Sequence, residues 1–240
     1  MTDVHVPDGF INAPVSLAAG AVAVAGVAVA LHGARRELDD RTAPLAGLVA
    51  AFVFAAQMLN FPVAAGTSGH LLGGALAAIL VGPYTGVLCV AVVLLVQALL
   101  FADGGLTALG VNIVVMGLVT VLAGYGLFRG LLRVLPRARA SVAGATFVAA
   151  VVSVPASALA FTAIYAVGGT ADVPLGRVAA AMVGVHVLIG IGEALITAVT
   201  VSSVLAVRPD LVHGAHGHVR RVELRTTPPS ETAGASGASA

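Results

Sequence analysis

Two short segments of the chain each carry a histidine in a setting that suits metal binding. His5 opens the run HVPDGF, and His70 closes the glycine-containing run GTSGH, 65 residues further along. Imidazole is the commonest side-chain ligand of transition ions and titrates near neutral pH. The pair predicts one metal ion held between two distant segments.

The residues after His5 favour a tight turn at Pro7-Asp8-Gly9, since proline fixes φ and glycine accepts a positive φ. Such a turn folds the N-terminus back towards the rest of the chain. An α-amine, a deprotonated backbone amide and imidazoles then supply nitrogen ligands, a set that suits Ni(II) or Cu(II), with Co(II) as a competitor. The alternative is a disordered terminus with an incidental histidine.

His70 follows an irregular glycine-containing loop and opens an apolar stretch. An ionisable side chain at membrane depth is a candidate for function, although a neighbouring carbonyl can also satisfy it. His186 and Glu193 lie seven residues apart on one expected helix. Glu193 is expected either to orient a ligand histidine or to pair with His186.

Other polar residues are candidates for supporting the metal ligands without touching the ion. The possible supporting set is Ser68, Asn60, Asn112, His186 and Glu193. Hydrogen bonds between helices are the alternative explanation for Gln57, Asn60 and Asn112. The tail histidines His213, His216 and His218 suggest at most a weak metal relay.

The composition indicates a membrane protein. Hydrophobic residues make up 59% of the chain, charged residues 10%, and the mean hydropathy is +1.04, whereas soluble domains carry about 25% charged residues. The sequence has no lysine and no tryptophan, which argues against nucleic-acid binding. The single cysteine, Cys89, lies in an apolar run and is expected to pack as a small residue.

A hydrocarbon core about 30 Å thick requires roughly 20 apolar residues per helix. This length criterion predicts an all-α membrane protein with about seven helices, near 13–32, 43–62, 69–82, 84–102, 106–128, 140–168 and 176–207. The third is short, at about 21 Å. Three regions follow: an extracytoplasmic metal-binding segment (1–12), a transmembrane domain (13–207) and a disordered cytoplasmic tail (208–240).

The basic residues orient this bundle. All twelve are arginines, and eleven lie in the loops 33–42 and 129–139 or in the tail, while only Arg177 lies in a loop of the other set. Because cytoplasmic loops collect arginine, the N-terminus is expected outside and the C-terminus inside. That orientation places His5 and the 63–70 loop on the same outer face.

Two other classes of protein compete with metal capture. The run GTSG and His186 allow an intramembrane serine protease with Ser68 as nucleophile, although this leaves His5 unexplained. An organic-solute permease leaves both outer histidines unexplained. The sequence lacks a phosphate-binding loop and has no lysine from which to form one, so this chain is not expected to be an enzyme, and any ATP hydrolysis must come from separate subunits.

Several co-linear motifs resemble the CbiM/NikM family, the substrate-specific membrane subunits of energy-coupling factor (ECF) transporters for cobalt and nickel. The motifs are HVPDGF (5–10), QMLNFPV (57–63), GTSGHL (66–71), LVGP (80–83) and IGIGEA (189–194). The resemblance covers roughly residues 4–207.

The resemblance implies a seven-helix bundle in a prokaryotic plasma membrane that imports Co(II) or, alternatively, Ni(II). Its implied partners are a transmembrane coupling subunit, a small accessory membrane subunit and two cytoplasmic ATPase subunits. In the family, the N-terminal amine, the second residue's amide and imidazole, and a later histidine hold the metal in a plane. His5 and His70 match the two imidazole positions.

The N-terminus departs from the family pattern, because the family's histidine directly follows the initiator methionine. Here residues 1–4 precede His5. We hypothesise that translation begins at Val4, which is then read as methionine. His5 becomes residue two in that case, and its neighbour supplies the amine ligand.

Overall fold

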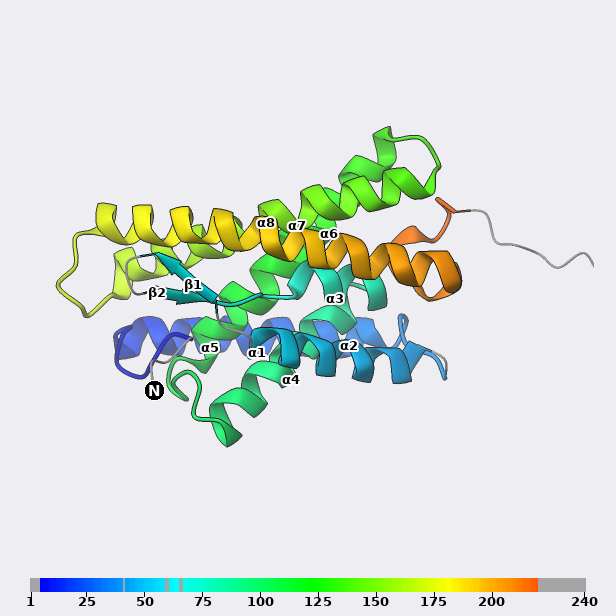
Figure 1. The fold of residues 1–240 in the computed structure, drawn as a ribbon. Helices are drawn as coiled ribbons and strands as arrows, with labels where there is room; N and C mark the ends of the chain where they lie inside the picture. The colour runs from blue at the N-terminus through cyan, green and yellow to red at the C-terminus, as the bar shows by residue number, and fades with distance from the viewer. Residues whose placement is uncertain (1–4, 41, 59–60, 65–66, 220–240) are drawn as a thin grey trace, which may run out of the picture.

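The computed structural model describes residues 5–40, 42–58, 61–64 and 67–219, with the backbone alone described for 61–64 and 67–69. The described chain is a bundle of helices with one short hairpin (Figure 1). The N-terminal segment and residues 209–219 lie at opposite ends of its long axis. The longest elements are α1 (Ala13–Ala34), α2 (Thr42–Gln57), α4 (Pro83–Leu100), α7 (Arg139–Gly168) and α8 (Leu175–Val207).

The expected all-helical membrane class is confirmed. Among the described residues, α1, α4, α7, α8 and the continuous helical stretch Leu109–Val134 are long and apolar enough to cross a membrane. The stretch consists of α5 (Leu109–Asn112), the π-helix η1 (Ile113–Val119) and α6 (Thr120–Val134). α2 is shorter, with 16 residues, although it too is apolar.

The expected helix over 69–82 is wrong in its first part. The helix α3 runs only from Gly74 to Val81, eight residues or about 12 Å, too short to cross a bilayer alone. Residues 70–73 lead into it without regular structure. The chain therefore carries a broken segment at membrane depth, a form that is tolerated where protein or a wet cavity surrounds it.

A β-hairpin replaces the end of the helix expected over 43–62. The strands β1 (Phe61–Ala64) and β2 (Thr67–Gly69) pair antiparallel, with Pro62 opposite Ser68. Pro62 accounts for the difference, because a proline disfavours the α conformation at the residue before it and cannot donate to a helix. The hairpin lies against α8 (Figure 1).

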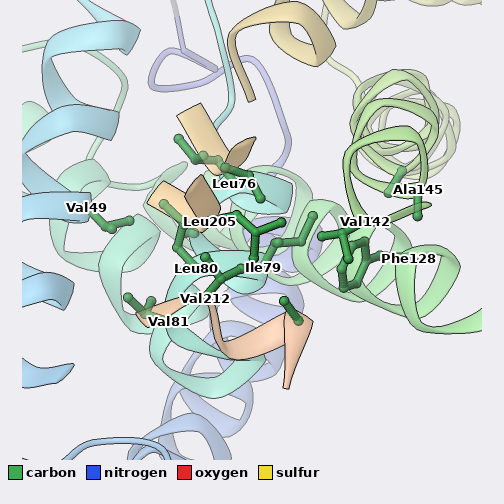
Figure 2. Packing of buried hydrophobic residues seen from close by; sticks show 14 of the residues in the cluster. Val49, Leu76, Ile79, Leu80, Val81, Phe128, Val142, Ala145, Leu205 and Val212 are labelled. Atoms are coloured by element: carbon green, nitrogen blue, oxygen red, sulfur yellow. The ribbon is translucent and has the colours of Figure 1, made fainter. Parts of the chain in front are cut away.

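The short helix α3 forms the centre of the core. All eight of its residues are buried, because α2, α4, α6, α7 and α8 surround it. Figure 2 shows Leu76, Ile79 and Leu80 among side chains from other helices, with Val212 of the tail beside them. Burial of such apolar side chains is worth about 1.5–3 kcal/mol each in water, but inside a bilayer close packing is the main source of stability.

The first part of the tail is ordered, in contrast to the expectation of disorder from residue 208. Two short 3₁₀ turns follow α8: η2 (Pro209–Leu211) packs on α8, and η3 (His213–Ala215) folds back onto α3 and α6. Val212 and Ala215 are buried in the core cluster. His218 Nε2 lies 2.6 Å from the Leu132 carbonyl. The apolar tail residues Val212 and Ala215 explain this order, because they bury their side chains against the core.

Candidate metal site

The N-terminal segment is fixed to the bundle by its backbone. The Phe10 amide donates to the Pro7 carbonyl at 3.4 Å, which confirms the expected turn. The Thr170 amide donates to the Phe10 carbonyl at 3.1 Å, and the Asn12 amide donates to the Gly168 carbonyl at 2.7 Å. The segment thus pairs with the loop between α7 and α8 before α1 begins.

The loop between α4 and α5 holds the other side of this segment. The Gly105 amide donates to the Val6 carbonyl at 3.0 Å. Asp8 Oδ1 accepts from the Thr107 amide at 2.8 Å and from the Thr107 hydroxyl at 2.5 Å. These bonds from Thr107 hold the pKa of Asp8 below its usual value.

Gly104 allows the close approach of this loop to the N-terminal segment. Its φ is +89°, which side chains rarely adopt, and a Cβ there would lie 2.8 Å from the Cβ of His5. A larger residue would therefore displace His5.

Asn112 clamps the backbone next to His5. Its Oδ1 accepts from the Val6 amide at 3.2 Å, and its Nδ2 donates to the Val6 carbonyl at 3.3 Å. Asn112 is buried at the end of α5, where the π-helix η1 begins. It therefore holds the N-terminal segment through the Val6 backbone.

His5 and His70 converge. Their ring centroids are 4.7 Å apart, with an interplanar angle of 69°, and both side chains are buried. The fold thus brings together two imidazoles that the sequence separates by 65 residues.

The ring nitrogens of the two histidines have different surroundings. His5 Nδ1 lies 3.2 Å from Asp103 Oδ1, within ion-pair range but without hydrogen-bond geometry, and no described residue hydrogen-bonds His5 Nε2. His70 Nδ1 lies 2.9 Å from the Leu71 carbonyl, which fits a proton on Nδ1 and a lone pair on Nε2.

The His70 ring is buried, which disfavours its charged form, and neutral imidazole is the form that binds metals. Among the described residues no group of three histidine, cysteine or acidic side chains is placed to hold an ion. Any further ligand in such a site must come from backbone nitrogen or from residues outside this part of the chain.

A cavity of about 530 Å³ adjoins the two imidazoles. It lies between the N-terminal segment, η1, α7 and α8, and most of its wall is apolar. Its polar lining residues are His5, His70, Asn112, Ser157, Arg177 and His186. An opening of this kind gives the imidazoles access from outside the bundle.

Of the two expectations for Glu193, the pairing with His186 is wrong. His186 Nδ1 lies 2.7 Å from the Met182 carbonyl of its own helix. Glu193 accepts instead from the amides of Leu72 and Gly73, at 2.6 and 3.0 Å. A buried carboxylate needs donors, and the broken segment before α3 provides two amides.

Three of the predicted site groups are described in part or not at all. Asn60 and the N-terminal amine proposed at Val4 lie outside the described residues. Ser68 is described through its backbone, which belongs to β2. The contact between Ser68 and His186 that the protease alternative requires therefore lies outside the described side chains.

One residue of the site was missed by sequence reasoning: Asp103 approaches His5 from the loop between α4 and α5. Gln57, expected to form hydrogen bonds between helices, donates through Nε2 to the Leu72 carbonyl at 2.8 Å. The signal for Asp103 was an acid followed by two glycines, in a loop expected on the same face as His5.

The long apolar helices define a polytopic membrane protein, with two histidines beside a largely apolar cavity. Comparison with known proteins identifies the family. Residues 5–211 match the family described as the cobalt uptake substrate-specific transmembrane region. The chain belongs to this family, and it is a membrane component of cobalt or nickel uptake.

Individual relatives agree with this assignment. A Haloquadratum walsbyi protein provisionally named for metal transport is 41% identical over 87% of this chain and 93% of its own length. An Archaeoglobus fulgidus protein provisionally named a fused nickel transport protein is 39% identical over 87% of this chain and 68% of its own. A crystal structure of a truncated transition metal transporter aligns with a TM-score of 0.73 and 30% identity, over 84% of this chain and 98% of that one.

Proposed function

We propose that the chain captures Co(II) or Ni(II) at the outer face of a prokaryotic plasma membrane, with His5 and His70 as imidazole ligands. The observation that carries the proposal is the convergence of the two rings, 4.7 Å apart and buried. The unbonded His5 Nε2 and the orientation of His70 by the Leu71 carbonyl add to it, because metal-binding histidines commonly use their second nitrogen in this way.

The backbone amide of His5 and the N-terminal amine complete a nitrogen set in this proposal. The amine becomes a ligand if translation begins at Val4. Four nitrogens in a plane suit Ni(II), and Co(II) competes for the same set. We favour cobalt because the family is described by cobalt uptake. Intact-mass measurement of the native protein tests the start: a mass that includes Thr2 and Asp3 excludes the amine next to His5.

The chain is the substrate-binding subunit of an ECF-type importer in this proposal. It works with a transmembrane coupling subunit, a small accessory membrane subunit and two cytoplasmic ATPases. The arginine distribution supports an outer N-terminus, since the end of the bundle opposite His5 carries the arginine-rich loops. Residues 1–12 then form the outer metal-binding segment, 13–207 the membrane domain and 208–240 the cytoplasmic tail.

Metal titration of the purified full chain tests the capture step. Wild-type protein should bind one Co(II) or Ni(II), and His5→Ala and His70→Ala should each weaken binding at least a hundredfold. The exposed His32 on α1 provides the matched control, because His32→Ala removes an imidazole far from the site. Equal affinities for wild type and both site variants would refute the proposal.

Uptake of labelled metal tests the assembly. Vesicles that contain all the proposed subunits should accumulate metal only with ATP, and omission of this chain should abolish uptake. Accumulation without the ATPase subunits would contradict the ECF assignment.

A further inference from the structure

Glu193 is a buried acid in the middle of the apolar helix α8, and only 2% of it is exposed. Both carboxylate oxygens are used. Oε2 accepts from the Leu72 amide at 2.6 Å, and Oε1 accepts from the Gly73 amide at 3.0 Å. The carboxylate therefore joins α8 to a segment about 120 residues earlier in the chain.

That segment carries His70. Residues 70–73 connect β2 to α3 without regular secondary structure, and the Gly73 carbonyl accepts the first helical bond of α3, from the Ala77 amide at 2.9 Å. From the other side, Gln57 of α2 donates to the Leu72 carbonyl at 2.8 Å. Both polar backbone groups of Leu72 are thus held by side chains, two residues after the imidazole.

The conformation of Gly73 makes the double contact with Glu193 possible. Its φ of +78° belongs to the left-handed region, and a Cβ there would lie 2.8 Å from the Val53 side chain. Glycine therefore lets two successive amides face one carboxylate, as in other backbone anion sites. Substitution would force the backbone away from Glu193.

The chemistry of the site calls for a carboxylate in particular. A glutamate accepts two hydrogen bonds and presents no donor, whereas glutamine would turn its NH₂ group towards one of the amides. An apolar residue would leave both buried amides without a partner, which is costly. Glu193 thus fixes the position of the backbone at Leu72 and Gly73.

We propose that Glu193 is a positioning residue for metal capture, which holds His70 in register with His5 and ties that imidazole to α8. The inference rests on the proposed function, because it assumes that His70 binds the metal. α8 packs chiefly on α7 and also lies against the β-hairpin. A displacement of α8 relative to α3 is then transmitted to His70 through Glu193.

Metal titration of Glu193→Gln and Glu193→Asp in the full-length protein tests this role. Glu193→Gln should weaken Co(II) or Ni(II) binding about 10- to 100-fold, the usual effect of removing a group that orients a ligand. Glu193→Asp keeps the charge and should recover part of that loss. Ser153→Ala is the matched control, since the buried Ser153 hydroxyl donates only to Ala150 of its own helix.

The visible spectrum of the Co(II)-saturated protein separates positioning from a general structural role. Displacement of His70 changes the ligand field, so the Co(II) bands of Glu193→Gln should shift, while those of Ser153→Ala should match wild type. A folded Glu193→Gln protein with wild-type affinity and spectrum would overturn the inference. If Glu193→Gln does not fold, a folded Glu193→Asp protein with wild-type affinity and spectrum overturns it instead.

The His70→Ala variant distinguishes the two levels of the argument. Wild-type affinity in His70→Ala would refute the proposed function itself. Weak binding in His70→Ala together with wild-type behaviour of the Glu193 variants would refute only the positioning role.

Discussion

Removal of the Asn112 side chain should weaken metal binding by releasing the N-terminal segment. Three hydrogen bonds hold the Val6 backbone, and two of them come from Asn112, at 3.2 and 3.3 Å. Asn112→Ala leaves only the bond from Gly105. The residue next to His5 is then free to leave the bundle.

The size of the effect follows from these two bonds. Each is worth about 0.5–1 kcal/mol net, since both are near the long end of the usual range. Their loss shifts the equilibrium between held and free segment by about 1–2 kcal/mol, which is about 5- to 30-fold. Ordering one residue costs about 1–2 kcal/mol, so the remaining bond from Gly105 does not offset the cost of ordering Val6. The apparent Kd for the metal should rise by about the same 5- to 30-fold.

Competitive titration with a metallochromic indicator measures this change. Gln97→Leu is the control, because the Gln97 amide on α4 is equally buried and has no hydrogen-bond partner in the described structure. It should leave the Kd unchanged. An Asn112→Ala protein that is folded and binds metal as tightly as wild type would refute the reasoning.

Three further predictions concern the contacts at the two ends of the bundle. Asp8 is stabilised as a carboxylate by Thr107, so its contribution is present above pH 3.8 and is lost as the pH falls through its lowered pKa. Asp8→Asn should therefore lower the melting temperature at pH 7 but not in strong acid; a gap that persists in acid would contradict this. Burial lowers the pKa of His213 below 6.5, so tail docking should be complete above that pH and weaken below it. Limited proteolysis of the tail should be faster at pH 5.5 than at 7.5, and His213→Gln should reduce the difference. Glu37 accepts from the amides of Tyr84 and Thr85, so Glu37→Ala should cost about 1–3 kcal/mol of unfolding free energy in detergent. An unchanged denaturation midpoint would count against that contact.

The sequence predicts the long helices and the pairing of the imidazoles. Helices such as α7 and α8 are continuous apolar stretches, which composition alone reveals. The convergence of His5 and His70 follows from the loop order, because the expected topology puts both on one face. The turn at Pro7 could be predicted because it depends only on neighbouring residues, proline and glycine.

The remaining features depend on contacts between distant residues. Glu193 binds the backbone amides of Leu72 and Gly73, and every residue type except proline has such an amide, so the sequence does not reveal this contact. The first residues of the β-hairpin lie in the helix expected over 43–62, where Pro62 signals the change, and the rest lies in the expected 63–70 loop. The order of the tail depends on a surface of α3 that exists only after folding.

The brevity of α3 has a consequence for how the protein is made. An apolar segment of eight residues is too short to enter the bilayer as an independent span during synthesis. Val212 and Ala215 complete the packing around α3, and they leave the ribosome later than every long helix. The core around α3 is therefore complete only after translation has passed the last long helix.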